Sequence, residues 1–247
     1  MAELFDSAPV MGPSTVNVLL YGAAGSGKTT AAASAPGPIV WINFEGESAL
    51  SFARKRAEEL GAEIKEVRIR PDEDPRPRVQ AATDFVRAGQ AATIVFDTFG
   101  KYREALAQAV GGDNVTLADW GVVGKTIRAT VRELRDLRAN VVLICHEEIV
   151  QGEEVIVQPL IGGKSTQEVC GEVDVIAYCS PHPNEDGVSY LGQLVEAKGR
   201  RAKDRSGALG VFRPLDLGEW FADYTAALAL DVSDVPFLNN DEEGEGK

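Results

Sequence analysis

The sequence is poor in the residues that build disulfide-stabilised, zinc-binding or membrane proteins. Its 247 residues include three cysteines and two histidines, and no two cysteines form a C-x-x-C pair. No apolar run reaches the roughly 18 residues of a transmembrane helix, and no basic segment precedes an apolar one at the N-terminus. We therefore expect reduced, buried thiols at Cys145, Cys170 and Cys179, no membrane partner and a cytoplasmic location.

Positive charge is also scarce. The formal net charge of −13 argues against wholesale non-specific binding to nucleic acid. The charge is unevenly spread, because residues 231–247 carry six acids and one lysine, whereas residues 198–205 carry five bases and one acid. A local stretch with a net charge of +4, called the basic strip below, therefore lies within an acidic protein.

The chain does contain a complete phosphate-loop pattern, G-x-x-x-x-G-K-[ST], between the apolar run 16–21 and a helix start. Glycines let backbone N–H groups curl around an anion, and the helix N-terminus adds its positive dipole end. Lys28 can reach the β- and γ-phosphates, and the Thr29 hydroxyl can ligate Mg²⁺. The pattern predicts bound ATP and Mg²⁺. The expected nucleotide-binding residues are Gly22, Ala23, Ala24, Gly25, Ser26, Gly27, Lys28, Thr29 and Thr30.

Apolar runs and amphipathic stretches alternate along the rest of the chain. This alternation predicts an α/β fold, with a mostly parallel sheet, helices on both faces and an antiparallel extension near the C-terminus. We expect one domain over residues 16–230, a flexible lead-in at 1–15 and an acidic, disordered tail at 231–247. Further strands are expected at 39–44, 64–69, 91–98, 140–146 and 174–179, a hairpin at 147–158, a polar loop at 160–166, and helices at 47–60, 78–89, 102–110, 116–138 and 218–230.

Three polar residues, Glu45, Asp97 and His146, stand where buried strands end. Ligands bind at the carboxyl ends of parallel strands, so we expect all three beside the phosphate loop. Asp97 would hold Mg²⁺ through water, with Thr29 as the direct ligand. Glu45 could deprotonate the attacking water, and His146 could sense the γ-phosphate. The alternatives are an ordinary strand-ending aspartate, a glutamate favoured by a helix dipole, and a histidine that only hydrogen-bonds locally.

The basic strip allows three interpretations. It could be a solvated hairpin loop, or it could contact the phosphates of nucleic acid. In the third interpretation, Lys203 and Arg205 reach the γ-phosphate bound to a neighbouring subunit, as an arginine finger does.

In this order, these parts resemble the RecA-like ATPase core. In that family, the phosphate loop is followed by a strand that ends in a catalytic glutamate, here W-I-N-F-E at 41–45. The segment shortly after it, S-F-A-R-K at 51–55, resembles the corresponding segment of the bacterial recombinase. K-D-R-S-G at 203–207 is similar to the lysine/arginine finger of hexameric helicases and recombinases. Residues 152–166 lie where the family has a mobile DNA-binding loop. The sensing position is His146, where the bacterial recombinase has glutamine.

The resemblance implies a core-only recombinase encoded by a phage and located in the host cytoplasm. It implies DNA-stimulated ATP hydrolysis, with Lys28, Glu45, Lys203 and Arg205 as catalytic residues. The implied partners are single-stranded DNA, a single-strand-binding protein and further copies of the chain, assembled head to tail in a ring or filament. A helicase-like motor, a small-molecule kinase and an ATP-binding scaffold without hydrolysis remain open as alternatives.

Overall fold

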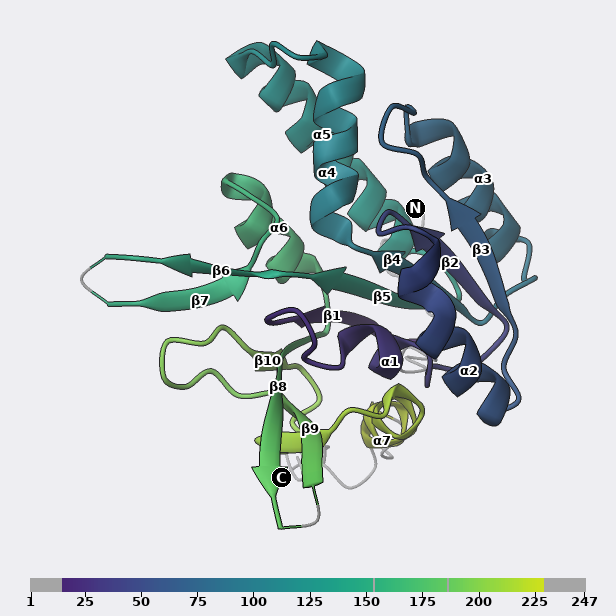
Figure 1. Cartoon of the computed structure of the whole chain (residues 1–247), viewed down its shortest axis with the longest axis vertical. Helices are drawn as coiled ribbons and strands as arrows, with labels where there is room; N and C mark the ends of the chain where they lie inside the picture. Colours follow the sequence, from purple (N-terminus) through teal and green to yellow (C-terminus); the bar gives the residue numbers. More distant parts are fainter. Residues whose placement is uncertain (1–14, 153, 186, 229–247) are drawn as a thin grey trace, which may run out of the picture.

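The computed structural model describes residues 15–152, 154–185 and 187–228; the expected tail and nearly all of the expected lead-in lie outside these residues. Strands and helices alternate over residues 17–111, and runs of consecutive strands follow later in the chain (Figure 1). The elements are β1 (Asn17–Tyr21), α1 (Lys28–Ala32), β2 (Ile39–Asn43), the 3-10 helix η1 (Glu47–Leu50), α2 (Ser51–Glu59), β3 (Ile64–Arg68), α3 (Arg76–Arg87), β4 (Thr93–Asp97), α4 (Phe99–Gly111), α5 (Leu117–Arg135), β5 (Asn140–Cys145), β6 (Glu147–Val150), β7 (Ile156–Pro159), α6 (Lys164–Glu172), β8 (Val175–Asn184), β9 (Gly187–Gln193), β10 (Lys203–Asp204), β11 (Phe212–Pro214) and α7 (Leu217–Leu228).

The main sheet has the strand order β11-β9-β8-β1-β5-β4-β2-β3, and β10 pairs with β8. The six strands from β8 to β3 are parallel to their neighbours. Strands β9, β10 and β11 are antiparallel. The expected mostly parallel sheet with an antiparallel extension is confirmed. Strand β5 lies between β1 and β4, so the strand that ends before His146 separates the phosphate-loop strand from the strand of Asp97.

Alternate side chains of each central strand enter one of two cores. Leu19 and Tyr21 of β1 pack with apolar residues of α3, α4, α5 and α6 on one face. Val18 and Leu20 pack with residues of α1, α2 and α7 on the other face. The helices therefore cover both faces of the sheet, as the alternation of elements predicts (Figure 1).

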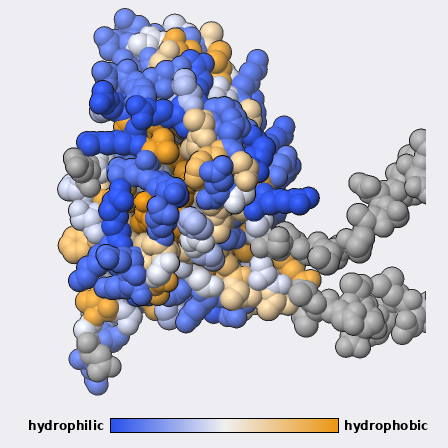
Figure 2. Space-filling view, turned by 90° about the vertical axis from the view of Figure 1, so that its right-hand side faces the viewer, coloured by the Kyte–Doolittle hydropathy of each residue, from blue (hydrophilic) through white to orange (hydrophobic). Residues whose placement is uncertain are grey.

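The surface is mixed in character. The face shown in Figure 2 is mostly hydrophilic, with apolar side chains in separate spots. Within the described ranges, no helix combines the length and apolar character needed to cross a membrane. Cys145, Cys170 and Cys179 are free and buried, as expected from their number and spacing.

The segment over residues 147–166 agrees with its sequence-based expectation in its first part and differs from it in its second part. The hairpin over 147–158 is confirmed as β6 and β7, and it projects from the body of the sheet (Figure 1). The polar loop expected at 160–166 is wrong in its second half, because α6 begins at Lys164. Ser165 and Thr166 are buried, and the Thr166 hydroxyl accepts a hydrogen bond from the Gly162 N–H at 3.0 Å. The polar side chains that suggested a loop thus belong to a packed helix start.

Candidate functional site

The phosphate loop connects β1 to α1 at the centre of the sheet. Gly25 and Gly27 have φ angles of 75° and 88°, in the left-handed region that glycine adopts at little cost. Gly22 is needed for another reason, since a Cβ there would lie 2.3 Å from the Cys179 carbonyl oxygen of β8. The glycines therefore allow the loop to curl and to pack tightly against the neighbouring strand.

Lys28 lies folded into this loop. Its Nζ donates to the carbonyl oxygens of Gly22 at 2.9 Å and Ala23 at 2.7 Å, and to the Ser26 hydroxyl at 3.1 Å. The side chain is buried, and this burial lowers the pKa of the Lys28 ammonium. Each of these acceptors is neutral, so the more strongly accepting oxygens of a triphosphate can replace them.

Thr29, in the first turn of α1, contacts Asp97, at the end of β4, although β5 lies between β1 and β4 in the sheet. The Thr29 hydroxyl donates to Asp97 Oδ2 at 3.2 Å. Asp97 is only 2% exposed, and burial, followed by the charge of Glu45, raises the pKa of its carboxyl to about 6. Hydroxyl and carboxylate oxygens suit Mg²⁺, which commonly takes one or two protein ligands and completes its shell with phosphates and water. The Thr29–Asp97 pair therefore fits the metal that the phosphate loop implies.

Glu45 lies at the same edge, in the turn that follows β2. The Asn43 side chain orders this turn, because its Oδ1 accepts the N–H groups of Glu45 at 2.8 Å and Gly46 at 3.2 Å. Glu45 Oε1 lies 3.8 Å from His146 Nε2, and Glu45 Oε2 lies 2.8 Å from Lys101 Nζ. The structure thus brings Glu45 and His146 together, and it adds Lys101, which the sequence pattern did not indicate.

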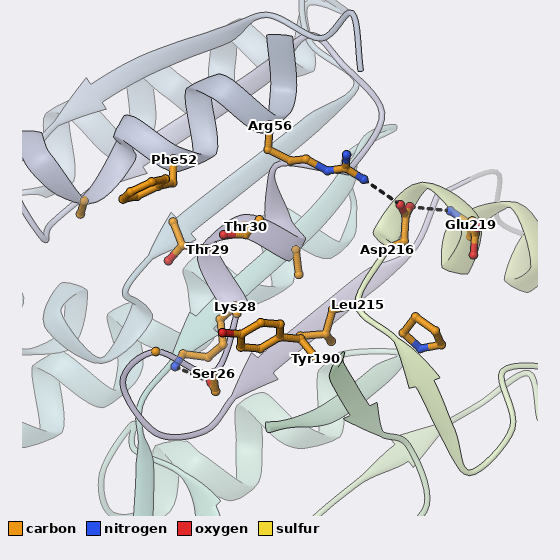
Figure 3. A pocket seen from close by; sticks show the side chains of 15 residues that line it. Ser26, Lys28, Thr29, Thr30, Phe52, Arg56, Tyr190, Leu215, Asp216 and Glu219 are labelled. Carbon is orange, nitrogen blue, oxygen red and sulfur yellow. Dashed lines mark hydrogen bonds and ion pairs between the residues drawn. The ribbon is translucent and has the colours of Figure 1, made fainter. Parts of the chain in front are cut away.

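A cavity of about 760 Å³ opens beside the phosphate loop and the start of α1 (Figure 3). Phe52 and Arg56 of α2 line one side, and Tyr190, Leu215 and Asp216 line the other (Figure 3). The Phe52 side chain is 78% exposed, and Arg56 pairs with Asp216 at 3.5 Å. The size is typical of small-ligand pockets. The cavity can therefore take the base and sugar of a nucleotide whose phosphates lie in the loop.

Tyr190 packs directly against the loop. A Cβ on Gly27 would lie 3.0 Å from Tyr190 Cδ1, so the aromatic ring occupies the space that this glycine leaves. Tyr190 belongs to β9, in the antiparallel extension of the sheet. The extension thus forms one wall of the nucleotide pocket, a role that no local sequence signal indicated.

Lys203 and Arg205 lie away from the phosphate loop of their own subunit. Lys203 Nζ donates to the Cys170 carbonyl at 2.7 Å, and Arg205 donates to Asp174 Oδ1 at 2.9 Å and the Gly171 carbonyl at 2.7 Å. These partners lie at the C-terminal end of α6 and just before β8, at the opposite edge of the sheet from the loop. Action on a neighbouring subunit therefore stays a prediction, and it would require these hydrogen bonds to break.

The first half of the basic strip lies along the hairpin. The Val157 N–H donates to the Gly199 carbonyl at 2.7 Å, and the Arg201 N–H donates to the Val157 carbonyl at 3.0 Å. The Tyr21 hydroxyl, at the end of β1, lies 3.0 Å from the Val157 oxygen and 2.7 Å from the Arg201 oxygen. The phosphate-loop strand, the hairpin and the basic strip are therefore connected through one side chain.

A phosphate loop after a central strand, an oxygen pair suited to Mg²⁺ and a glutamate at the same sheet edge define a P-loop nucleotide-binding domain with a mostly parallel sheet. Residues 14–206 match the model of the AAA_24 family, described as an AAA domain, and the chain belongs to this family. It is thus an AAA-type P-loop ATPase domain, a class that binds nucleotide and usually uses Mg²⁺.

Among solved structures, the chain is similar to the KaiC-like protein PH0186 from the hyperthermophilic archaeon Pyrococcus horikoshii OT3. The two share 14% sequence identity, over 74% of this chain and 79% of that chain, with a TM-score of 0.46. No curated protein matches the sequence.

Proposed function

We propose that this protein is a DNA-stimulated ATPase of phage recombination, which anneals or exchanges single strands of DNA. The observation that supports hydrolysis most directly is the contact of Thr29 with Asp97, beside a buried Lys28 and a strand-end Glu45. A protein that only held ATP would not need a carboxylate at the position of Glu45. The finer role in recombination draws its support from the resemblance of residues 41–55 and 203–207 to recombinases.

In the proposed reaction, Glu45 takes a proton from water as the water oxygen bonds to the γ-phosphorus. The bond between that phosphorus and the bridging oxygen breaks, and ADP leaves with the bonding electrons. Lys28 stabilises negative charge on the β- and γ-phosphates. His146 lies 3.8 Å from Glu45, and its proposed role is to sense the γ-phosphate. Mg²⁺, held by Thr29 and through water by Asp97, would neutralise phosphate charge when bound.

The nucleotide pocket suits an aromatic base. Phe52 and Tyr190 present ring surfaces on different walls of the cavity, and most of the Phe52 side chain is exposed. Stacking on such rings contributes about 0.5–1.5 kcal/mol beyond the area that is buried. We propose that the adenine stacks against Phe52 and that Asp216 and Glu219 lie near the ribose.

The basic strip and the hairpin form the proposed path of single-stranded DNA. The hairpin alone suits phosphates poorly, because its described residues include Glu147, Glu148 and Glu154. Arg200 and the adjacent cations of the strip lie beside it and offset this charge, and Arg200 stacks over the Tyr178 ring at 4.5 Å. We expect DNA to contact the strip and a single-strand-binding protein to assist loading.

Lys203 and Arg205 would act on ATP bound to the next subunit of a ring or filament.

The proposal is tested by measuring ATP hydrolysis with no DNA, with single-stranded DNA and with duplex DNA. Single-stranded DNA should raise the rate, and the protein should speed the pairing of complementary strands without separating a duplex. The Arg200→Gln variant should need more DNA for half-maximal stimulation, and its binding should depend less steeply on salt. Arg138→Gln serves as the matched control, because Arg138 lies in the turn between α5 and the start of β5, whereas the hairpin follows the opposite end of β5. Hydrolysis that DNA does not change would contradict the proposal, and strand separation would instead indicate a motor.

A further inference from the structure

Lys101, in the first turn of α4, forms an ion pair with Glu45. Its Nζ lies 2.8 Å from Glu45 Oε2, while the Thr98 hydroxyl and His146 Nε2 lie 3.4 Å and 3.8 Å from Oε1. Both oxygens of the carboxylate thus face a polar or cationic neighbour. A general base must offer a lone pair to the water that it deprotonates. Lys101 therefore competes with that water for Glu45.

Lys101 is the more accessible member of this pair. Its side chain is 42% exposed, against 23% for Glu45. Glu45 is also fixed by the hydrogen bonds of its turn to Asn43, whereas the ammonium stands at the end of a flexible four-carbon stem. Ion pairs with such exposure change an equilibrium by only a few-fold. A competing anion can therefore draw the lysine away and leave Glu45 in place.

A second cavity, of about 530 Å³, borders Lys101. Arg70, Phe44 and Gln108 are among its lining residues, and neither Glu45 nor the phosphate loop is. A phosphate group in this cavity would meet the cations of Arg70 and Lys101. Asp72 and Glu104 also line the cavity, so a small free anion gains little there. A phosphate carried on nucleic acid is held by the rest of its chain as well, and it is the favoured occupant.

We propose that Lys101 is a positioning residue that holds Glu45 in this ion pair while DNA is absent. When a phosphate group of single-stranded DNA enters the second cavity, it pairs with the Lys101 ammonium and releases Glu45. The inference rests on the proposed function, because it gives the DNA dependence of hydrolysis a physical cause. In this arrangement, DNA and ATP occupy different cavities, and Lys101 connects them.

The first experiment compares ATP hydrolysis by the wild type, Lys101→Met and Lys101→Arg, with and without a single-stranded oligonucleotide. Lys101→Met should raise the DNA-free kcat by about two- to fivefold, leave KM for ATP within a factor of about two, and lose most of the stimulation by DNA. Lys101→Arg should keep the wild-type response. Lys65→Met is the matched control, because Lys65 pairs with Glu63 at 3.3 Å on the edge strand. A Lys101→Met variant with an unchanged or lower DNA-free kcat overturns the inference.

A second experiment does not depend on hydrolysis. Urea unfolding of the nucleotide-free wild type, Lys101→Met, Glu45→Gln and the double variant measures the coupling of the two side chains. We expect a coupling of about 1.4- to fivefold in the unfolding constant, which the oligonucleotide should remove. No coupling, or a coupling that the oligonucleotide leaves unchanged, overturns the inference. If inorganic phosphate alone removes the coupling, the assignment to nucleic acid is wrong. A wild type that hydrolyses no ATP contradicts only the proposed function, since the coupling still tests the pair.

Discussion

Replacing Asp97 by asparagine should make the nucleotide-free protein more stable at neutral pH. Asp97 is 2% exposed, and burial, together with the nearby charge of Glu45, raises the pKa of its carboxyl from 3.8 to about 6. A shift of this size corresponds to roughly 3 kcal/mol of unfavourable free energy for the charged form in the folded protein. Asparagine removes the charge, keeps the size of the side chain and still offers an oxygen to the Thr29 hydroxyl.

The sign of the pH dependence follows from proton binding. The folded protein holds a proton on Asp97 more tightly than the unfolded chain does. The contribution of this group to stability is therefore full below about pH 4 and falls as the pH rises to about 6. The free energy of unfolding of Asp97→Asn should exceed that of the wild type by up to about 3 kcal/mol at pH 7.5. This difference should disappear near pH 4.

Urea unfolding at several pH values measures this difference directly. Asp119→Asn is the opposite-sign control, because hydrogen bonds from Thr116 lower the pKa of Asp119. That variant should be less stable than the wild type at neutral pH, and the loss should vanish in acid. With Mg²⁺ and a non-hydrolysable ATP analogue, the wild type should gain more stability than Asp97→Asn, because ligands stabilise the state that binds them. An Asp97→Asn variant that is no more stable at pH 7.5 would refute the reasoning.

Three further predictions concern the proposed reaction. Lys28→Ala should abolish ATP hydrolysis, and undiminished phosphate release would contradict the phosphate-loop assignment. Phe52→Ala should raise KM for ATP by about two- to tenfold, as the loss of stacking implies, with kcat nearly unchanged; an unaltered KM would mean that the base binds elsewhere. Arg205→Ala should lose hydrolysis but keep nucleotide binding, measured with a fluorescent ATP analogue. Mixing it with Glu45→Gln subunits should restore part of the activity if Arg205 acts across an interface, and no recovery would count against that role.

The sequence was most informative where function depends on neighbours along the chain. The phosphate loop needs a strand, glycines at fixed positions, Lys28 and a helix start, and all of these lie within a few residues of one another. Asp97 and Glu45 could be placed beside it, because parallel strands carry their carboxyl ends to one edge of a sheet. The structure confirms the sheet and brings these side chains together, while their catalytic roles stay predictions.

Contacts between distant segments could not be predicted in this way. Tyr190 packs against Gly27 only because β9 folds back on β8, and Lys101 reaches Glu45 only because β2 and β4 are neighbours. The start of α6 was missed for a different reason. Lys164, Ser165 and Thr166 follow two glycines and look like a polar loop, but the Thr166 hydroxyl satisfies the Gly162 N–H and is buried. The available signal was the helical spacing of the apolar residues Val169, Cys170 and Val173, all of which are buried.

The position of β1 between β5 and β8 has a consequence for synthesis on the ribosome. The strand is complete at Tyr21, but its two neighbours begin only at Asn140 and Val175. At typical translation rates, on the order of ten seconds pass between the synthesis of β1 and the synthesis of β5, its first hydrogen-bonded neighbour. During that time β1 is an unpaired hydrophobic strand, a preferred substrate for chaperones and for aggregation. The nucleotide loop that the chain makes first is thus among the last parts to become functional, and yield in cells should depend strongly on temperature and on chaperone supply.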